Sequence, residues 1–398
     1  MKERKPPFVI GVLANFSGQP ANPPPRLRDR RFVTVTKESF AQFQRNRKPR
    51  IALRAPVPAE GPQTSPAGLT FERLEEFSAE SLARNIAEQG IARVEEAAWI
   101  AGQAMMDADY QALYATWTGL RYLVDSVAGN PSVRVKVWDV SRKELLRDVQ
   151  RASQFDQTAL FRKVYQEGIG TFGGEAFGCL IGDYYLTDNS EDIGLIETVS
   201  NVAAAARAPF LYGLQPGFLH LERWQDLNAE AAKSTIAWAN FCQSQEASRV
   251  FPLLPRFAFS GRPQPEEPFG RVWINPAILV ASAAGGAYRE AGLLESAQNL
   301  LPEWSGPASG ATATEATGAI LAGEVEFECD CPEELQGTLA ELGVNALTRA
   351  SVGRGDFLQS LICAARAGRE RGRLTLAHAL DWCNLVNRIH EQIRCERS

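Results

Sequence analysis

The chain has 398 residues, of which 45% are hydrophobic and 22% charged, an ordinary composition for a globular protein long enough for two domains. No charged-then-apolar leader opens it and no run approaches 18 uncharged apolar residues, so we expect no secretory signal, no spanning helix and no membrane partner. The net charge is −5, and an odd count of seven cysteines is typical of reduced thiols in a cytoplasmic protein.

The N-terminal quarter alternates strand-like segments with short helices. Residues 7–16 form an apolar run that meets a turn at Ser17-Gly18, which predicts a buried strand. Ser78 precedes an amphipathic pattern with Leu82 and Ile86 on one face, which predicts a capped helix. Further strands are expected at 32–36, 50–54 and 69–71, a short helix at 37–44, and Pro-rich loops at 21–31 and 56–66.

The middle of the chain predicts an α/β fold. A helical pattern runs from 94 to 124 with a break near Asp107, and Val133, Val135 and Val137 alternate as in a strand. Ser141-Arg-Lys-Glu144 is a capping box at a helix start. Strands expected at 179–185 and 209–213 and helices expected at 159–166 and 192–206 complete a βαβα order, which is typical of a sheet covered by helices.

The last part of the chain is mostly helical in pattern. Residues 221–248, which include Trp224 and Trp238, predict a helix, and residues 305–317 are low in complexity and predict a loop. We also expect an Ala-rich helix at 273–287, a strand at 324–329, a helix at 332–342 that stops at Gly343, and a long terminal helix at 375–394.

Charge is distributed unevenly along the sequence. Residues 1–54 hold thirteen Lys and Arg against three acidic residues, a balance of +10, so the remainder carries −15. Such a basic segment could bind nucleic acid, or it could dock on the acidic remainder of the same chain or of a neighbouring copy. Its basic residues lie between strand-like segments without the aromatic platform that single strands stack on, so we expect no nucleic-acid partner.

Motifs that could carry chemistry have simpler explanations. Residues 168–173 match G-x-G-x-x-G, but a predicted helix precedes them and a strand follows, the reverse of the dinucleotide-binding order. Cys329-Asp-Cys331 lacks the C-x-x-C pairs of zinc sites, and no histidine lies in a nucleophile motif. We therefore predict no catalytic residue, no cofactor and no metal, and a protein that is not an enzyme. Three acidic residues that could form a carboxylate pair are more simply caps, turns or ion pairs: Asp156, Glu175 and Asp183.

A dense aromatic series runs through the middle of the chain. Core packing explains it most simply. The alternative is that some members are exposed anchors of a subunit interface, where aromatic residues are enriched. The series consists of Trp117, Tyr122, Phe155, Phe161, Tyr165, Phe172 and Phe177.

Two groups of sequence words carry a family resemblance. The first comprises Trp117-Thr-Gly-Leu-Arg-Tyr-Leu-Val-Asp125 and the run from Phe155 to Tyr184, which contains Thr171-Phe-Gly-Gly-Glu175. The second comprises Pro7-Phe-Val-Ile-Gly-Val-Leu-Ala-Asn-Phe-Ser-Gly18, Leu27-Arg-Asp-Arg-Arg-Phe-Val33 and Leu69-Thr-Phe-Glu72. The first group closely resembles the large sheath subunit of type VI secretion systems, and the second resembles the small sheath subunit.

The resemblance implies a contractile-sheath-like α/β fold with mixed sheets flanked by helices. It implies a small-subunit-like domain at 1–90, a shortened helical connector at 91–106, and a reduced large-subunit-like domain at 107–398 that lacks the family's C-terminal β segment. The two parts would pack together, as the separate family subunits do in their heterodimer. Family heterodimers stack in helical rings around an inner tube, and exchanged terminal strands join neighbouring protomers.

By this resemblance the chain is a fused structural subunit of a type VI-like contractile apparatus. Its partners would be further copies or other sheath subunits, the inner-tube protein and baseplate components. The chain differs from the family in the terminal parts of the subunits, where the connector is shortened and the C-terminal β segment is lacking. We therefore expect neighbouring protomers to be joined differently from those of the family. We also doubt that the AAA+ ATPase that recycles contracted sheath recognises the chain. The alternative is a non-polymerising adaptor or cap that binds a sheath end, the baseplate or the tube. The candidate structural or interface residues are Trp117, Arg121, Asp125, Phe155, Phe161, Phe172, Gly173, Gly174, Glu175 and Asp183.

Overall fold

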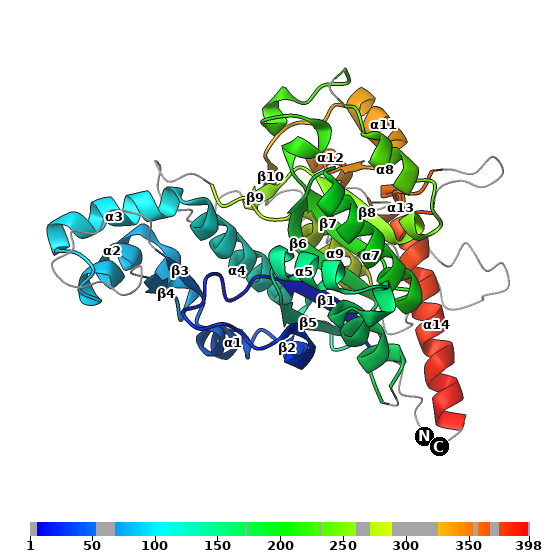
Figure 1. Cartoon of the computed structure of the whole chain (residues 1–398), viewed down its shortest axis with the longest axis horizontal. Coiled ribbons are helices and arrows are strands. Elements are labelled where there is room, and N and C mark those ends of the chain that lie inside the picture. Colours follow the sequence, from blue (N-terminus) through cyan, green and yellow to red (C-terminus); the bar gives the residue numbers. More distant parts are fainter. Residues whose placement is uncertain are drawn as a thin grey trace.

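A seven-stranded sheet forms the centre of the molecule (Figure 1). The computed structural model describes residues 6–52, 68–171, 173–230, 232–259, 271–288, 325–352, 357–366 and 374–396. Neighbouring strands are parallel, except for β2, which runs antiparallel to β5 at one edge. The predicted α/β class with a mixed sheet is confirmed. In sheet order the strands are β11 (Asn345–Ala346), β8 (Val250–Leu254), β7 (Phe210–Leu214), β6 (Cys179–Leu186), β1 (Phe8–Ala14), β5 (Val133–Asp139) and β2 (Val33–Val35).

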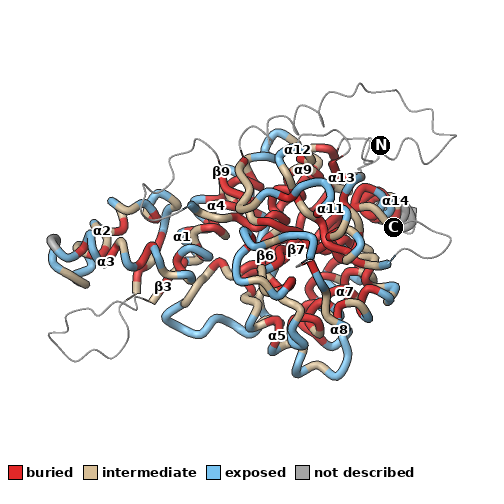
Figure 2. The backbone as a smooth tube through the Cα atoms, turned by 90° about the horizontal axis from the view of Figure 1, so that it is seen from above, coloured by how far each residue is buried: buried red, intermediate tan, exposed pale blue. Residues whose placement is uncertain are grey.

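Helices cover both faces of this sheet. Ile10 and Val12 of β1 belong to one buried apolar cluster and Val9 and Leu13 to another, because successive side chains of a strand point to opposite faces. Seen from above, the sheet lies between α9 on one side and α5 and α7 on the other (Figure 2). The covering helices are α4 (Ala108–Val127) and α9 (Pro276–Ala287) on the first face, and α5 (Arg142–Arg151) and α7 (Ser190–Ala206) on the second.

A helical arm extends away from the sheet, at the left of Figure 1. Phe71 and Phe77 stack inside it with ring centroids 4.0 Å apart, and Ile86 and Ile100 are buried beside them in the same cluster. The predicted strands at 50–54 and 69–71 pair antiparallel near its base. The elements of the arm are β3 (Arg50–Ala52), β4 (Gly68–Thr70), η2 (Leu74–Phe77), α2 (Ala79–Glu88) and α3 (Val94–Met106), whereas α1 (Phe40–Arg47) packs against α4 nearer the sheet.

Predicted helix signals at three positions are confirmed. Ser141 accepts a hydrogen bond from the Glu144 backbone, and the Glu144 carboxylate accepts one from the Ser141 backbone, which completes the capping box of α5. Ser78 caps α2 in the same way through the Ser81 amide. Asp107 caps α4 and separates it from α3, so the expected break lies where the sequence placed it.

The continuous helix predicted for residues 221–248 is wrong. The structure has short helical turns there, η6 (Trp224–Asp226), α8 (Ile236–Phe241) and η7 (Glu246–Arg249). Polar side chains between them bind the backbone locally: Asn228 donates to the Asp226 carbonyl, and Thr235 restarts the helix by accepting from the Trp238 amide. Trp224 and Trp238 are both buried, so their spacing reflects two separate contacts with the core.

The remaining predictions differ from the structure only in detail. The Ala-rich helix starts at Pro276 because Asn275 caps it, and the helix at 159–166 continues as a π-helix. The loops predicted at 56–66 and 305–317 lie outside the described residues. The other described elements are η1 (Leu27–Asp29), η3 (Phe155–Gln157), α6 (Ala159–Phe161), η4 (Arg162–Ile169), η5 (Pro216–Leu219), β9 (Phe257–Phe259), β10 (Val325–Phe327), α11 (Glu333–Glu341), α12 (Arg349–Val352), α13 (Phe357–Ser360) and α14 (Leu376–Glu396).

None of the described helices combines the length and the apolar character that crossing a bilayer requires.

Candidate functional site

The N-terminal segment of the chain supplies a central strand of the sheet. β1 lies between β5 and β6 and is parallel to both, with Ile10 opposite Val135 on one side and Cys179 on the other. The Phe8 amide donates to the Ser132 carbonyl at 2.8 Å, which extends the pairing beyond the strand. Residues 6–90 and the rest of the chain therefore share one hydrogen-bonded sheet. We call the contact between these two parts the seam.

Asp139 is a buried hydrogen-bonding centre of the seam. It lies at the end of β5 and is 5% exposed. Its carboxylate accepts from the Phe16 amide at 2.9 Å, from the Ser17 amide at 3.2 Å and from the Ser17 hydroxyl, and it forms an ion pair with Arg47 at 3.5 Å. One acidic side chain thus fixes the turn after β1 and one end of α1. The sequence analysis did not single out Asp139, and its place after a predicted strand was the available signal.

A second charged contact joins the seam beside α5. Arg30 donates to Glu144 and also to the Asp139 carbonyl at 2.6 Å, and only 8% of its side chain is exposed. Burial alone would raise the pKa of Glu144, but hydrogen bonds from Arg30 and Ser141 and the positive charge of Arg30 hold it below its usual value. Glu144 therefore serves the capping box of α5 and the seam together.

Trp117 lies in the core between the two parts and is fully buried. The rings of Phe16, Phe40 and Phe43 surround it at centroid distances of 5.4, 5.8 and 5.5 Å. Its indole Nε1 donates to the Phe16 carbonyl at 3.1 Å. The structure thus places this aromatic residue in core packing across the seam, away from any exposed surface.

Arg121 and Asp125 extend the seam along α4. The Arg121 Nε donates to Asp125 at 2.7 Å, and its guanidinium lies 5.3 Å from the centre of the Phe40 ring. Lys37 approaches the same carboxylate at 3.9 Å. These residues are partly exposed, so their ion pairs contribute less than the buried contacts at Asp139.

Asp183 lies on β6, beside Thr116 of α4 and Asn275 at the start of α9. Its carboxylate accepts a hydrogen bond from the Thr116 hydroxyl at 2.6 Å. Burial raises the pKa of Asp183 to about 6, although hydrogen bonds from Thr116 and Asn275 act in the opposite direction. Asn275 also donates to the Tyr184 carbonyl at 3.1 Å and caps α9, so this cluster ties α4, α9 and β6 together.

The glycine-rich turn before β6 holds three of the candidate residues. Gly173 has a φ of +77°, and a Cβ on Gly174 would lie 2.1 Å from the Gly168 carbonyl oxygen, so both positions require glycine. Glu175 forms ion pairs with Arg134 and Lys136 of β5. Phe172 lies outside the described residues. The ion pairs of Glu175 therefore connect the turn before β6 to β5, across the intervening strand β1.

Phe155 lies in η3, and Phe161 is the last residue of α6. Their rings meet edge to face at 5.6 Å, and Phe161 stacks on Tyr165 at 4.9 Å. Phe155 is 36% exposed, whereas Phe161 is 9% exposed. Of the described candidate aromatics, Phe155 alone presents a large exposed apolar surface.

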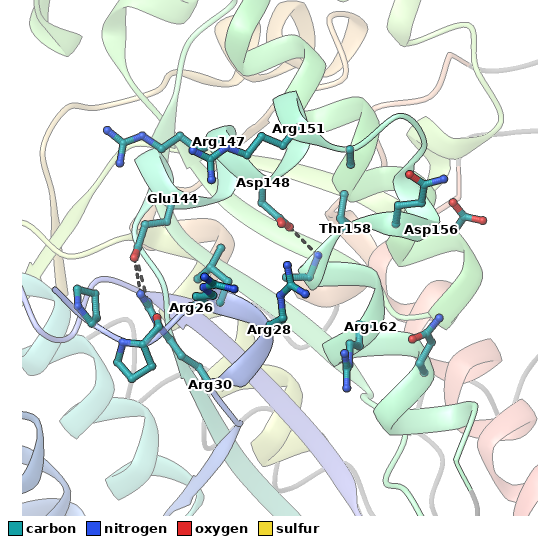
Figure 3. Close-up of a pocket in the computed structure, with 17 residues that line it drawn as sticks. Arg26, Arg28, Arg30, Glu144, Arg147, Asp148, Arg151, Asp156, Thr158 and Arg162 are labelled. Carbon is teal, nitrogen blue, oxygen red and sulfur yellow. Dashed lines mark hydrogen bonds and ion pairs between the residues drawn. The ribbon is translucent and has the colours of Figure 1, made fainter.

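A cavity lined by arginines lies beside the seam, and the sequence analysis did not find it. It has a volume of about 730 Å³ and opens between residues 24–30, α5 and the segment from η3 to η4 (Figure 3). The basic excess of residues 1–54 was the only sequence signal for it. Its arginines are Arg26, Arg28, Arg30, Arg147, Arg151 and Arg162, and its acidic residues are Glu144, Asp148 and Asp156. We call it the arginine cavity.

The described residues contain no group of three His, Cys, Asp or Glu side chains arranged to hold a metal ion. Cys329 and Cys331 are free thiols, as are the four other cysteines that the structure describes. Burial raises the pKa of the Cys383 thiol to about 12, although the charge of Arg249 and a hydrogen bond from Asn387 lower it, so that thiol stays protonated at neutral pH. The G-x-G-x-x-G match spans the end of a π-helix and the turn before β6, with no helix N-terminus after it.

Two family models together match most of the chain. The model VipB, described as the EvpB/VC_A0108 tail sheath N-terminal domain, matches residues 91–349. The chain belongs to this tail sheath family. The model T6SS_VipA, described as type VI secretion system VipA, VC_A0107 or Hcp2, matches residues 1–90. The resemblance to both sheath subunits is confirmed, and the two matches adjoin at residue 90.

Two proteins of Pseudomonas aeruginosa are similar to separate parts of this tail sheath family member. The type VI secretion system sheath protein TssC1 is 31% identical over 162 residues, which cover 38% of this chain and 32% of TssC1. The sheath protein TssB1 is 34% identical over 80 residues, which cover 20% of this chain and 46% of TssB1. The aligned parts thus span less than half the length of either relative.

The seam coincides with the junction between the two sheath families. β1 lies in the segment that matches the VipA family. On both sides it pairs with strands from the segment that matches the VipB family. Asp139 and Glu144 of the VipB-family part bind the turn after β1 and Arg30 of the VipA-family part. In this tail sheath family member the two sheath modules therefore form a single folded body.

Proposed function

We propose that the chain is a fused structural subunit of a contractile, type VI-like sheath, which assembles with further sheath subunits around an inner tube. The observation that carries the proposal is the central position of β1, which lies between β5 and β6 of the tail sheath part in a sheet that both parts share. A joint sheet, with buried charges shared across it, is the arrangement of a permanent complex. Fusion would hold the two modules together at high effective concentration in every protomer.

We divide the chain for this function into a small-subunit-like part at 1–90, a helical connector at 91–106 and a large-subunit-like part at 107–398. In this scheme Trp117, Arg121 and Asp125 join the two parts of the protomer, and Asp183 lies between β6, α4 and α9 inside the large-subunit-like part. The turn with Gly173, Gly174 and Glu175 positions β6, and Phe155 lies on the outer surface as a contact for a neighbour. Phe161 supports Phe155 through the contact between their rings.

The proposed role is structural and without catalysis, since both matched relatives are named as sheath proteins. The inner-tube protein and the baseplate are the proposed partners besides sheath subunits, and the recycling ATPase is not expected to bind strongly. The proposed location is the cytoplasm, because the six cysteines that the structure describes are all unpaired.

Electron microscopy tests the assembly directly. The purified protein is imaged in negative stain alone and after co-expression with the inner-tube protein of its own system. We expect rings or tubes, with the tube protein inside them. A particle that stays monomeric or dimeric in both preparations, and in size-exclusion chromatography at high concentration, would contradict a sheath protomer and support an adaptor or cap.

A further inference from the structure

Most arginines of the arginine cavity lack a partner within the described part of the chain. Arg30 is bound to Glu144, and Arg162 lies 3.5 Å from Glu167. The other four are exposed, and their side chains form no ion pair or hydrogen bond with the described residues. These four are Arg26, Arg28, Arg147 and Arg151, which come from the η1 loop and from α5.

The acidic residues of the cavity neutralise these arginines only in part. Glu144 is already shared between Arg30 and the cap of α5. Asp148 accepts a hydrogen bond from the Ala159 amide at 2.7 Å, and burial raises its pKa although Arg151 and Arg28 lower it. Six arginines against three carboxylates leave a net charge of +3 in one hollow. Arginine presents a planar fork of donors that matches carboxylates, so the cavity suits an acidic protein surface.

The same chain carries a matching acidic surface elsewhere. Residues 324–341 contain seven acidic residues and no Lys or Arg. Glu326 and Glu328 are paired with Arg271 and Arg256. Three further carboxylates near the start of α11 are exposed and form no ion pair with described residues: Asp330, Glu333 and Glu334. We call these three the acidic edge.

The acidic edge complements the charge of the arginine cavity better than the glutamates of the arm do. On the arm, Glu80 is paired with Arg84, and Arg73 and Arg93 are interspersed among the remaining acids. The acidic edge has no such neighbours in sequence. α11 and α5 lie well apart in two perpendicular views, so the acidic edge does not reach the arginine cavity of its own molecule (Figures 1 and 2).

We propose that the arginine cavity receives the acidic edge of a second copy of the chain, as a contact between neighbouring protomers. The two surfaces differ and lie at different places on the protomer, so the contact is head-to-tail. Head-to-tail contacts that do not close into a ring generate open helical assemblies. The inference rests on the proposed sheath function and names a contact through which that assembly forms. Complementary charges of this kind mainly determine the register between two protomers and the rate at which they associate.

Charge reversal tests the contact. The variant Arg147→Glu/Arg151→Glu inverts the cavity, and Glu333→Arg/Glu334→Arg inverts the acidic edge. A third protein carries all four changes, which restores opposite charges across the contact. The control Lys143→Glu/Lys233→Glu makes the same change in net charge on exposed lysines that do not line the cavity. Each full-length protein is checked for an unchanged melting temperature, and the concentration needed for assembly is measured by sedimentation and negative-stain microscopy.

We expect each double variant to need about tenfold more protein for assembly. The fourfold variant and the lysine control should assemble like the unchanged protein. If the unchanged protein assembles and Arg147→Glu/Arg151→Glu assembles equally well, the inference is wrong and the proposed function stands. If the cavity variant fails and the fourfold variant is not rescued, the acidic edge is not the occupant and the inference is again wrong. If the unchanged protein never associates, the inference and the sheath function fail together.

Discussion

Helix α5 carries two groups of charges that differ in how they are satisfied. Near its N-terminus Glu144 is bound by Arg30 and by the Ser141 amide, beside the buried carboxylate of Asp139. One to two turns further on, Arg147 and Arg151 are exposed and form no ion pair with described residues. The first group closes the seam inside one protomer. The second group is available to bind a neighbouring protomer. Whether a charge has an ion-pair partner inside the protomer therefore distinguishes charges that stabilise the fold from charges available for assembly.

Removing the largest side chain of the seam should have the largest effect. Trp117→Ala is expected to lower the free energy of unfolding by about 3–5 kcal/mol, because a fully buried indole leaves a cavity among three phenylalanine rings. Urea denaturation measures the loss. Trp99→Ala is the matched control, since Trp99 is 57% exposed on the arm and should change stability by about 0.5 kcal/mol or less. Equal effects of the two changes would contradict the assignment of Trp117 to the seam.

The buried carboxylate of the seam comes next. Asp139→Ala should cost about 2–4 kcal/mol, because it leaves the Phe16 and Ser17 amides without an acceptor and Arg47 without a partner. The comparison is Asp226→Ala, which breaks an exposed pair with Arg223 and should cost about 0.5 kcal/mol. Thermal unfolding at pH 7 gives both values. A loss at Asp139 no larger than that at Asp226 would show that the seam does not depend on this carboxylate.

Replacing Asp183 should change the stability in the opposite direction from replacing Asp139. Its pKa is raised to about 6 in the folded protein from 3.8, so its contribution is most favourable below pH 3.8 and is lost as the pH rises through about 6. Asp183→Asn, which retains a group able to bond Thr116, is therefore expected to be more stable than the unchanged protein at pH 7.5 by on the order of 2 kcal/mol. The difference should fade toward pH 4 when melting temperatures are compared.

Glu144→Gln provides the contrast for that experiment. The pKa of Glu144 is lowered in the folded protein, so its stabilisation is present above its unfolded value of 4.5 and is lost as the pH falls through the folded value. This variant should be less stable than the unchanged protein at pH 7.5, with a difference that shrinks in acid. Identical pH profiles for Asp183→Asn and Glu144→Gln would refute both assignments.

The smallest effect on stability is expected at the unpaired arginines. Arg147→Glu/Arg151→Glu should change the free energy of unfolding by about 0.5 kcal/mol or less, since both side chains are exposed and form no ion pair with the described residues. Chemical denaturation alongside Asp139→Ala measures this directly. A loss comparable to that of Asp139→Ala would place these arginines among the charges that stabilise the fold.

Local signals in the sequence were sufficient for much of the fold. The capping box at Ser141, the break at Asp107 and the alternation of Val133, Val135 and Val137 each depend on neighbours a few residues away. The failure at 221–248 has the same origin, because Asn228 and Thr235 bind the backbone locally and interrupt an apparently helical pattern.

The candidate site depended on contacts that sequence spacing does not reveal. Asp139 meets Phe16 across 123 positions of the chain, and no local pattern distinguishes it from other acids that follow a strand. The arginine cavity likewise needs a loop near residue 28 to fold against a helix near residue 150. Composition gave the basic excess of the N-terminal segment, and only the tertiary structure separated the bound Arg30 from the unpaired Arg147.

High-resolution cryo-electron microscopy of the assembled protein would show which chain supplies the central strand β1 of each sheet. We expect a helical sheath in which β1 lies between β5 and β6 of its own protomer, so that both sheath modules of one chain share one sheet. A polymer in which β1 inserts into the sheet of a neighbouring copy, or a preparation with no polymer under any condition that assembles the inner tube, would contradict this expectation.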